Sequence, residues 1–155
     1  MGNSFTMPSA LNATLQSTTT TTYQTINFED VQSILYDNET LLINTLEATQ
    51  QQCLIVGTVP VEKETAIMNI QLTKNKKTRI VVYGMNSSDI SILKKYEQLQ
   101  HLGFSNVFLY LGGLFEWLLL QDIYSAKLFP TTTHERDILK YKGRPQFNLR
   151  LLTNS

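Results

Sequence analysis

Hydrophobic residues are densest between residues 80 and 117, where they form two continuous runs with a helical pattern between them. Ile80-Val81-Val82-Tyr83 and Val107-Phe108-Leu109-Tyr110-Leu111 lack polar alternation, which is typical of strands covered on both faces. The positions at helical spacing between them are Ile92, Tyr96, Leu99 and Leu102, followed by Gly103. A strand, helix, strand order favours parallel strands, so the pattern predicts an α/β fold with a buried parallel sheet.

The flanking residues extend this pattern. Asn27 and Asp30 form a helix N-terminus signature, and residues 41–43 and 54–56 are short apolar runs typical of strands. Two further helices are expected. One begins after Pro60 and buries Ala66, Ile67 and Ile70, and the other spans residues 115–124 with Trp117 against the sheet. We therefore expect a three-layer α/β/α fold with a central, mainly parallel sheet of about five strands.

Three regions are expected along the chain. Residues 1–22 carry no charge and end in Thr18 to Thr22, a composition that favours a flexible tether. Residues 23–130 form the folded domain. Residues 131–155 have little periodicity, and we expect a C-terminal tail that docks in part on the domain.

A candidate site follows from the edge of the sheet. In parallel α/β sheets, ligands bind beyond the carboxyl ends of the strands. The segment Gly84-Met85-Asn86-Ser87-Ser88-Asp89 follows one predicted strand, and Asn44 and Thr45 end another. We expect these residues to face one another.

The order of these motifs resembles a rhodanese-like domain. The resemblance rests on an Ile-Val-Val-Tyr strand, a six-residue loop, a helix ending in Leu-Gly-Phe, and Gly112-Gly113 followed by Trp117. Active members carry a nucleophilic cysteine as the first loop residue, a position that the resemblance assigns to Gly84. The Asp and Arg of the family's first strand motif map onto Asn44 and Leu46, and its turn histidine maps onto Leu54 or Cys53.

The resemblance therefore implies a fold without its nucleophile, because a thiolate itself attacks the substrate in this chemistry. The loop has no cation to hold an anion, and Asp89 stands where a helix dipole favours negative charge. We expect a non-catalytic binding or regulatory module with a protein partner. The expected binding residues are Asn44, Thr45, Gly84, Asn86, Ser87 and Ser88.

Two catalytic alternatives stay open. Cys53 is the one cysteine of the chain, and a sulfurtransferase could use it from a shifted position. Ser87 or Ser88 with Asp89 could support hydrolysis, although the nucleophile-elbow pattern and a positioned histidine are missing. Helix capping is the simpler role for these three side chains.

Composition narrows the partner classes. Thirteen basic residues balance thirteen acidic ones. The chain therefore has no net positive charge that would favour binding to nucleic acid. A single cysteine excludes an intramolecular disulfide, and the two histidines lack the spacing of a zinc site. We expect no metal and no cofactor.

The first six residues, Met1-Gly2-Asn3-Ser4-Phe5-Thr6, match the N-myristoylation pattern. A single acyl chain on Gly2 would give only weak, reversible membrane association. No apolar run resembles a secretory signal, so we expect a cytoplasmic protein that associates with membranes only if Gly2 is acylated.

Overall fold

The computed structural model describes residues 21–147 of the 155-residue chain. Its sheet has four parallel strands in the order β1-β4-β3-β2. The strands are β1 (Thr25–Ile26), β2 (Thr40–Asn44), β3 (Arg79–Tyr83) and β4 (Val107–Tyr110). Gly2, on which the myristoylation prediction rests, lies outside the described residues, as do residues 148–155.

The sheet therefore has one strand fewer than the five expected from the sequence. Residues 54–56 make only an isolated bridge, in which Ile55 pairs with Thr131, and their backbone bonds run to residues 130 and 132. The segment ends at Gly57, whose φ of +88° turns the chain. The two-residue strand β1 was not expected from its sequence and is defined by its pairing with β4.

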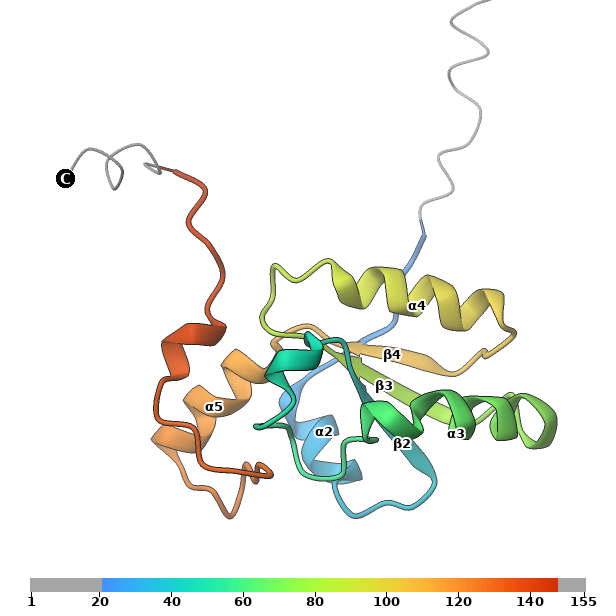
Figure 1. The fold of residues 1–155 in the computed structure, drawn as a ribbon, viewed down its shortest axis with the longest axis horizontal. Helices are drawn as coiled ribbons and strands as arrows, with labels where there is room; N and C mark the ends of the chain where they lie inside the picture. Colours follow the sequence, from blue (N-terminus) through green and yellow to red (C-terminus); the bar gives the residue numbers. More distant parts are fainter. Residues whose placement is uncertain (1–20, 148–155) are drawn as a thin grey trace, which may run out of the picture.

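Helices cover both faces of the sheet, which confirms the three-layer α/β/α prediction (Figure 1). Helices α3 (Val61–Lys74) and α4 (Ser91–His101) contribute to a core with the side chains of one face. Helices α2 (Phe28–Ile34) and α5 (Gly113–Ile123) pack on the other face. Alternate residues of β3 supply the two cores, with Ile80 and Val82 in the first and Val81 and Tyr83 in the second.

Helix α2 begins as the sequence predicts. The Asn27 side chain accepts from the backbone of residues 29 and 30, and Asp30 accepts from the Asn27 backbone. This reciprocal pair satisfies donors that a helix N-terminus leaves open.

The buried face of α3 differs from the expected one. Met68 is buried and Leu72 packs beside it, whereas Ala66 is exposed and Ile70 is 48% exposed. Ile67, the third residue of the expected face, is half-buried. The helix meets the core through Met68 and Leu72, which the expected face did not include. Within residues 21–147, no helix has both the length and the apolar character needed to cross a membrane.

Two 3₁₀ turns complete the fold. The first, η1 (Ala48–Gln50), follows β2. The second, η2 (Ile138–Tyr141), packs on α5, and its Tyr141 is only 2% exposed. Residues 131–141 thus contribute to the same core as the sheet.

The strand register fixes where the candidate site lies. Asn44 is level with Tyr83, and Tyr83 is level with Tyr110. Residues 45, 84 and 111 therefore leave the sheet together at its carboxyl edge. Figure 1 shows η1 and the turn from β3 to α4 at this edge.

Candidate functional site

The loop between β3 and α4 is organised around the carboxylate of Asp89. One oxygen, Oδ2, accepts the backbone N–H of Met85 at 2.9 Å. The other, Oδ1, accepts the backbone N–H of Ser91 at 3.0 Å and its hydroxyl at 2.6 Å. Hydrogen bonds from N–H groups to a carboxylate are among the stronger ones in proteins. Asp89 thus takes donors that an anion bound in this loop would otherwise use.

A second side chain, that of Asn86, forms a hydrogen bond with the backbone in the middle of the loop. Asn86 is buried, and its Oδ1 accepts the backbone N–H of Ser88 at 2.9 Å. The Asn86 carbonyl accepts from the Asp89 backbone at 3.1 Å. The loop therefore closes on itself through short side-chain turns.

Gly84 begins the loop in a space that excludes a side chain. A β-carbon at Gly84 would lie 2.5 Å from Asp89 Oδ2 and 2.9 Å from a methyl of Ile92. Both distances are shorter than van der Waals contact. The carboxylate of Asp89 occupies the volume that a residue-84 side chain would need.

The start of α5 holds the loop from the other side. Leu114 N donates to Gly84 O at 3.0 Å, and Phe115 N donates to Met85 O at 2.9 Å. Gly113 has a φ of +66°, and a β-carbon there would lie 2.7 Å from Gly84 O. Close backbone approach thus explains why the second glycine of the Gly-Gly pair is required. The free N–H groups of the helix terminus bind the loop backbone.

Asn44 and Thr45 play different parts at the end of β2. Asn44 is 5% exposed, and its amide exchanges hydrogen bonds with Gln51 and accepts from Leu46 N. Its side chain supports the turn into η1. The Thr45 hydroxyl lies 2.7 Å from that of Ser91, which joins the end of β2 to the start of α4.

A cleft of about 380 Å³ lies over this edge of the sheet. Of the sequence-predicted binding residues, the structure brings Thr45, Asn86 and Ser88 to its lining. Asn44, Gly84 and Ser87 do not line it. The remaining lining residues are Leu46, Glu47, Gln50, Met85, Asp89, Ser91, Lys142, Gly143, Arg144 and Gln146.

The C-terminal segment forms one wall of the cleft, a contribution that the sequence analysis missed. Asn86 Nδ2 donates to the Tyr141 carbonyl at 2.9 Å, which anchors the segment to the loop. Lys142 and Arg144 then follow along the cleft. The one available signal was the basic run at residues 140–144, which lies beyond the expected domain boundary.

Cys53 lies in the core rather than at the cleft. It is 1% exposed, packs in the cluster with Tyr83 and Tyr141, and its thiol lies 3.5 Å from the carbonyl of Thr133. Burial raises the pKa of the Cys53 thiol. A thiol that is buried and held protonated is poorly placed to attack a substrate.

The serine alternative lacks its partners in the described part of the chain. Ser87 and Ser88 are exposed, and their hydroxyls make no hydrogen bond with Asp89 or a histidine. Residues 21–147 also contain no cluster of three histidine, cysteine or acidic side chains that could hold a metal ion. The geometry presents a cleft with a satisfied loop and a basic wall.

Solved structures match this chain at low sequence identity. The Alr3790 protein from Anabaena is 19% identical, and the match covers 74% of this chain and 97% of that chain with a TM-score of 0.51. The single-domain sulfurtransferase RDL2 from Saccharomyces cerevisiae is 14% identical, with coverages of 68% and 97% and a TM-score of 0.49. EanB in complex with ergothioneine is 17% identical, with a TM-score of 0.45. That match covers 57% of this chain but only 24% of the EanB chain.

No curated protein matches the chain. A family model does match, and it describes a rhodanese-like domain over residues 27–120. That range runs from the N-cap of α2 through β4 and most of α5, so it includes the strands and the loop that build the cleft. This chain therefore belongs to the rhodanese-like domain family.

Proposed function

We propose that this chain is a non-catalytic rhodanese-like module that recognises a protein partner through the cleft at the carboxyl edge of its sheet. The recognition surface combines Thr45, Asn86 and Ser88 with the wall formed by residues 142–146. Gly84 takes the position of the family's nucleophile. Asn44 does not line the cleft, but its side chain holds the turn into η1, which forms the wall opposite residues 142–146.

The observation that carries the proposal is the position of the Asp89 carboxylate. It lies where the side chain of residue 84 would extend, and it accepts the Met85 N–H of the loop. A reactive cysteine would need this space, and a bound anion would need this donor. The loop is therefore stabilised in a form that holds neither a reactive cysteine nor a bound anion.

Sulfur transfer from thiosulfate to cyanide tests the proposal. The wild-type protein should be inactive, and Gly84→Cys alone should stay inactive because Asp89 blocks the new side chain. Gly84→Cys/Asp89→Ser removes the carboxylate and keeps a capping hydroxyl, so activity should appear in this variant if the loop retains family geometry. Sulfur transfer by the wild-type protein would contradict the proposal.

Cys53→Ala completes the experiment, because Cys53 is the alternative nucleophile. If the wild-type protein were active and this variant were not, a sulfurtransferase using Cys53 would replace the binding-module proposal. Circular dichroism of each variant before the assay separates loss of chemistry from loss of fold. The proposal predicts that wild type and Cys53→Ala are equally inactive.

A further inference from the structure

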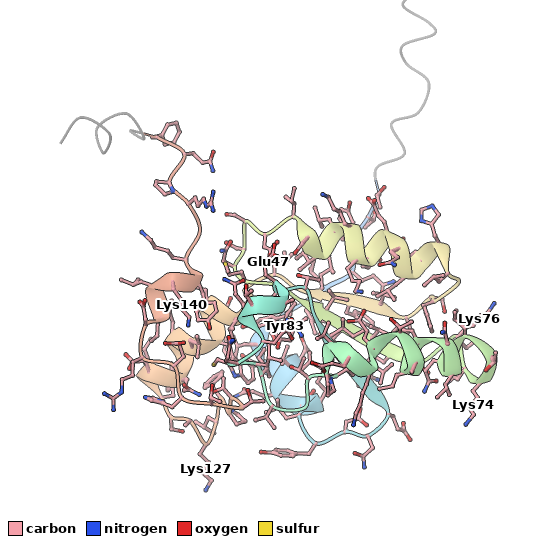
Figure 2. The ribbon with its side chains drawn as sticks, viewed as in Figure 1. Glu47, Lys74, Lys76, Tyr83, Lys127 and Lys140 are labelled. Carbon is pink, nitrogen blue, oxygen red and sulfur yellow. The ribbon has the colours of Figure 1, made fainter. Side chains whose placement is uncertain are left out.

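The two long walls of the cleft differ in chemistry. One wall comes from η1 and the residue before it and carries Glu47 and Gln50. The other comes from the C-terminal segment and carries Lys142 and Arg144. In Figure 2, Glu47 on the first side and Lys140, at the start of the second, lie on the same end of the molecule.

Both cations of the basic wall line the cleft. Lys142, Gly143, Arg144 and Gln146 line the cleft, whereas residue 145 does not. Lys142 has an extended backbone, with φ of −63° and ψ of 155°, and Arg144 precedes Pro145, which disfavours helical backbone at Arg144. The two cations line the cleft two residues apart, so acidic side chains at alternate positions of an extended ligand match their spacing.

This wall is attached firmly at its start. Tyr141 is 2% exposed in the core, and its carbonyl is held by Asn86. Gly143 lies against the loop, since a β-carbon there would be 3.5 Å from the Ser88 hydroxyl. The position of the cations is therefore set by the loop of the candidate site.

Lys142 and Arg144 have no anionic partner among the described residues. The ion pairs within residues 21–147 are Lys95 with Glu64 and Lys140 with Glu135. The adjacent Asp89 is already engaged by Met85 and Ser91. Two cations that face a cleft unpaired favour an anionic ligand.

The opposite wall offers an acceptor without a donor. Gln50 Oε1 is buried and has no hydrogen-bond partner in the described part of the chain. Buried acceptors in native proteins are nearly always satisfied. Gln50 lines the cleft, so a turn of its side chain towards a bound ligand would bring this closed-off oxygen to an N–H group, and a peptide backbone carries such groups.

We propose that the cleft binds an extended peptide segment with acidic side chains at alternate positions. Its carboxylates pair with Lys142 and Arg144, and one of its backbone N–H groups donates to Gln50 Oε1. Glu47 on the far wall repels the acidic face and fixes the orientation of the segment. This inference rests on the proposed function of the domain as a binding module.

Fluorescence anisotropy with synthetic peptides tests the charge and its spacing. The probe is a fluorescein-labelled peptide, Gly-Glu-Ala-Glu-Ala-Glu-Gly. A Gln-for-Glu version removes the charge, and Gly-Glu-Glu-Glu-Ala-Ala-Gly keeps the charge but loses the alternation. The alternating acidic probe should bind most tightly, and binding should weaken with added salt because the charges are exposed. Equal binding of the Gln peptide would overturn the proposal.

Variants of the chain locate the contact. Lys142→Gln/Arg144→Gln should weaken binding about tenfold, as expected for two exposed ion pairs. Lys74→Gln/Lys127→Gln makes the same charge change away from the cleft (Figure 2) and should stay within about twofold of wild type. Gln50→Met removes the acceptor and should weaken binding about fivefold. If the two double variants bind the probe equally, the cleft is not its site and the proposal fails.

The same samples separate this inference from the function on which it rests. If the probe does not bind and the sulfur-transfer assay is silent, the acidic-peptide proposal fails alone. If wild type transfers sulfur, the binding-module proposal fails first. Thermal melting of each variant checks that a loss of binding is not a loss of fold.

Discussion

Asp89 Oδ2 lies 2.5 Å from the point where a β-carbon on Gly84 would stand. The two residues begin and end the same loop, and each depends on the other. The glycine leaves room for the carboxylate, and the carboxylate uses that room to accept the Met85 N–H. The carboxylate of the last loop residue thus occupies the space that a side chain on the first loop residue would need.

This dependence predicts the effect of Gly84→Ala on stability. The added methyl collides with Asp89 and Ile92, and such overpacking costs about 1–3 kcal/mol. Gly143→Ala is the matched control, because a β-carbon there meets its neighbours at 3.5 Å or more. It should change stability by less than about 1 kcal/mol. Urea denaturation of both variants measures the difference.

A double-mutant cycle with Asp89→Ser identifies the cause. If the carboxylate is what a residue-84 methyl meets, the two substitutions should interact by about 0.5–3 kcal/mol. The double variant should be more stable than the sum of the single losses predicts. Strict additivity would mean that Gly84→Ala acts through Ile92 alone.

Tyr83 gives a second prediction, because its hydroxyl ties the sheet to the turn at residues 55–58. The hydroxyl accepts from Ile55 N at 3.2 Å and lies 2.8 Å from the Thr58 hydroxyl. Tyr83→Phe leaves that buried N–H unpaired and should cost about 1–3 kcal/mol. Tyr110→Phe is the control, since the Tyr110 hydroxyl is buried without a hydrogen-bond partner in the described residues. It should be neutral or slightly stabilising by the same urea measurement.

The same tyrosine predicts a pH dependence. Burial raises the pKa of Tyr83 above its ordinary value. Because the folded-state pKa exceeds that of the unfolded chain, this contribution to stability is complete below about pH 10. It is lost as the pH rises further, when unfolding allows the phenol to ionise. Unfolding free energies measured from pH 8 to 11 should fall above pH 10, by a smaller amount in Tyr83→Phe.

The reactivity of Cys53 is a third prediction. Its burial and raised pKa should make the native thiol react with an aromatic disulfide reagent far more slowly than a free cysteine does. Added urea should accelerate the reaction in parallel with unfolding, because labelling then requires opening of the core. Fast labelling of the native protein would show that Cys53 is accessible and would revive the sulfurtransferase alternative.

The sequence predicted the parts of the fold that depend on local patterns. The helix cap at Asn27, the turn at Gly103 and the continuous apolar run of β3 each depend on a few neighbouring residues. The two-residue β1 is defined instead by Leu109 N, which bonds to the carbonyl of Gln24. A pairing between residues 85 positions apart leaves no local signal.

The sequence likewise located only one part of the cleft. The loop at residues 84–89 could be found because it follows a strongly apolar strand. Its basic wall could not, because Lys142 and Arg144 reach the cleft only through the burial of Tyr141 and its bond to Asn86. Long-range docking of a segment without periodicity is invisible to patterns of three or four residues.

Tyr141 therefore carries the last prediction, which concerns where the domain ends. If residues 131–147 belong to the folded unit, Tyr141→Ala should destabilise the whole domain by about 3–5 kcal/mol, the cost of truncating a buried aromatic side chain. Phe147→Ala, at a position that is 87% exposed, should change stability by less than about 0.5 kcal/mol. Tryptophan fluorescence in urea reports the transition directly, because Trp117 is buried in the same cluster as Tyr141. A Tyr141→Ala variant as stable as Phe147→Ala would mean that the C-terminal segment only rests on the domain, and the basic wall of the cleft would then not be fixed.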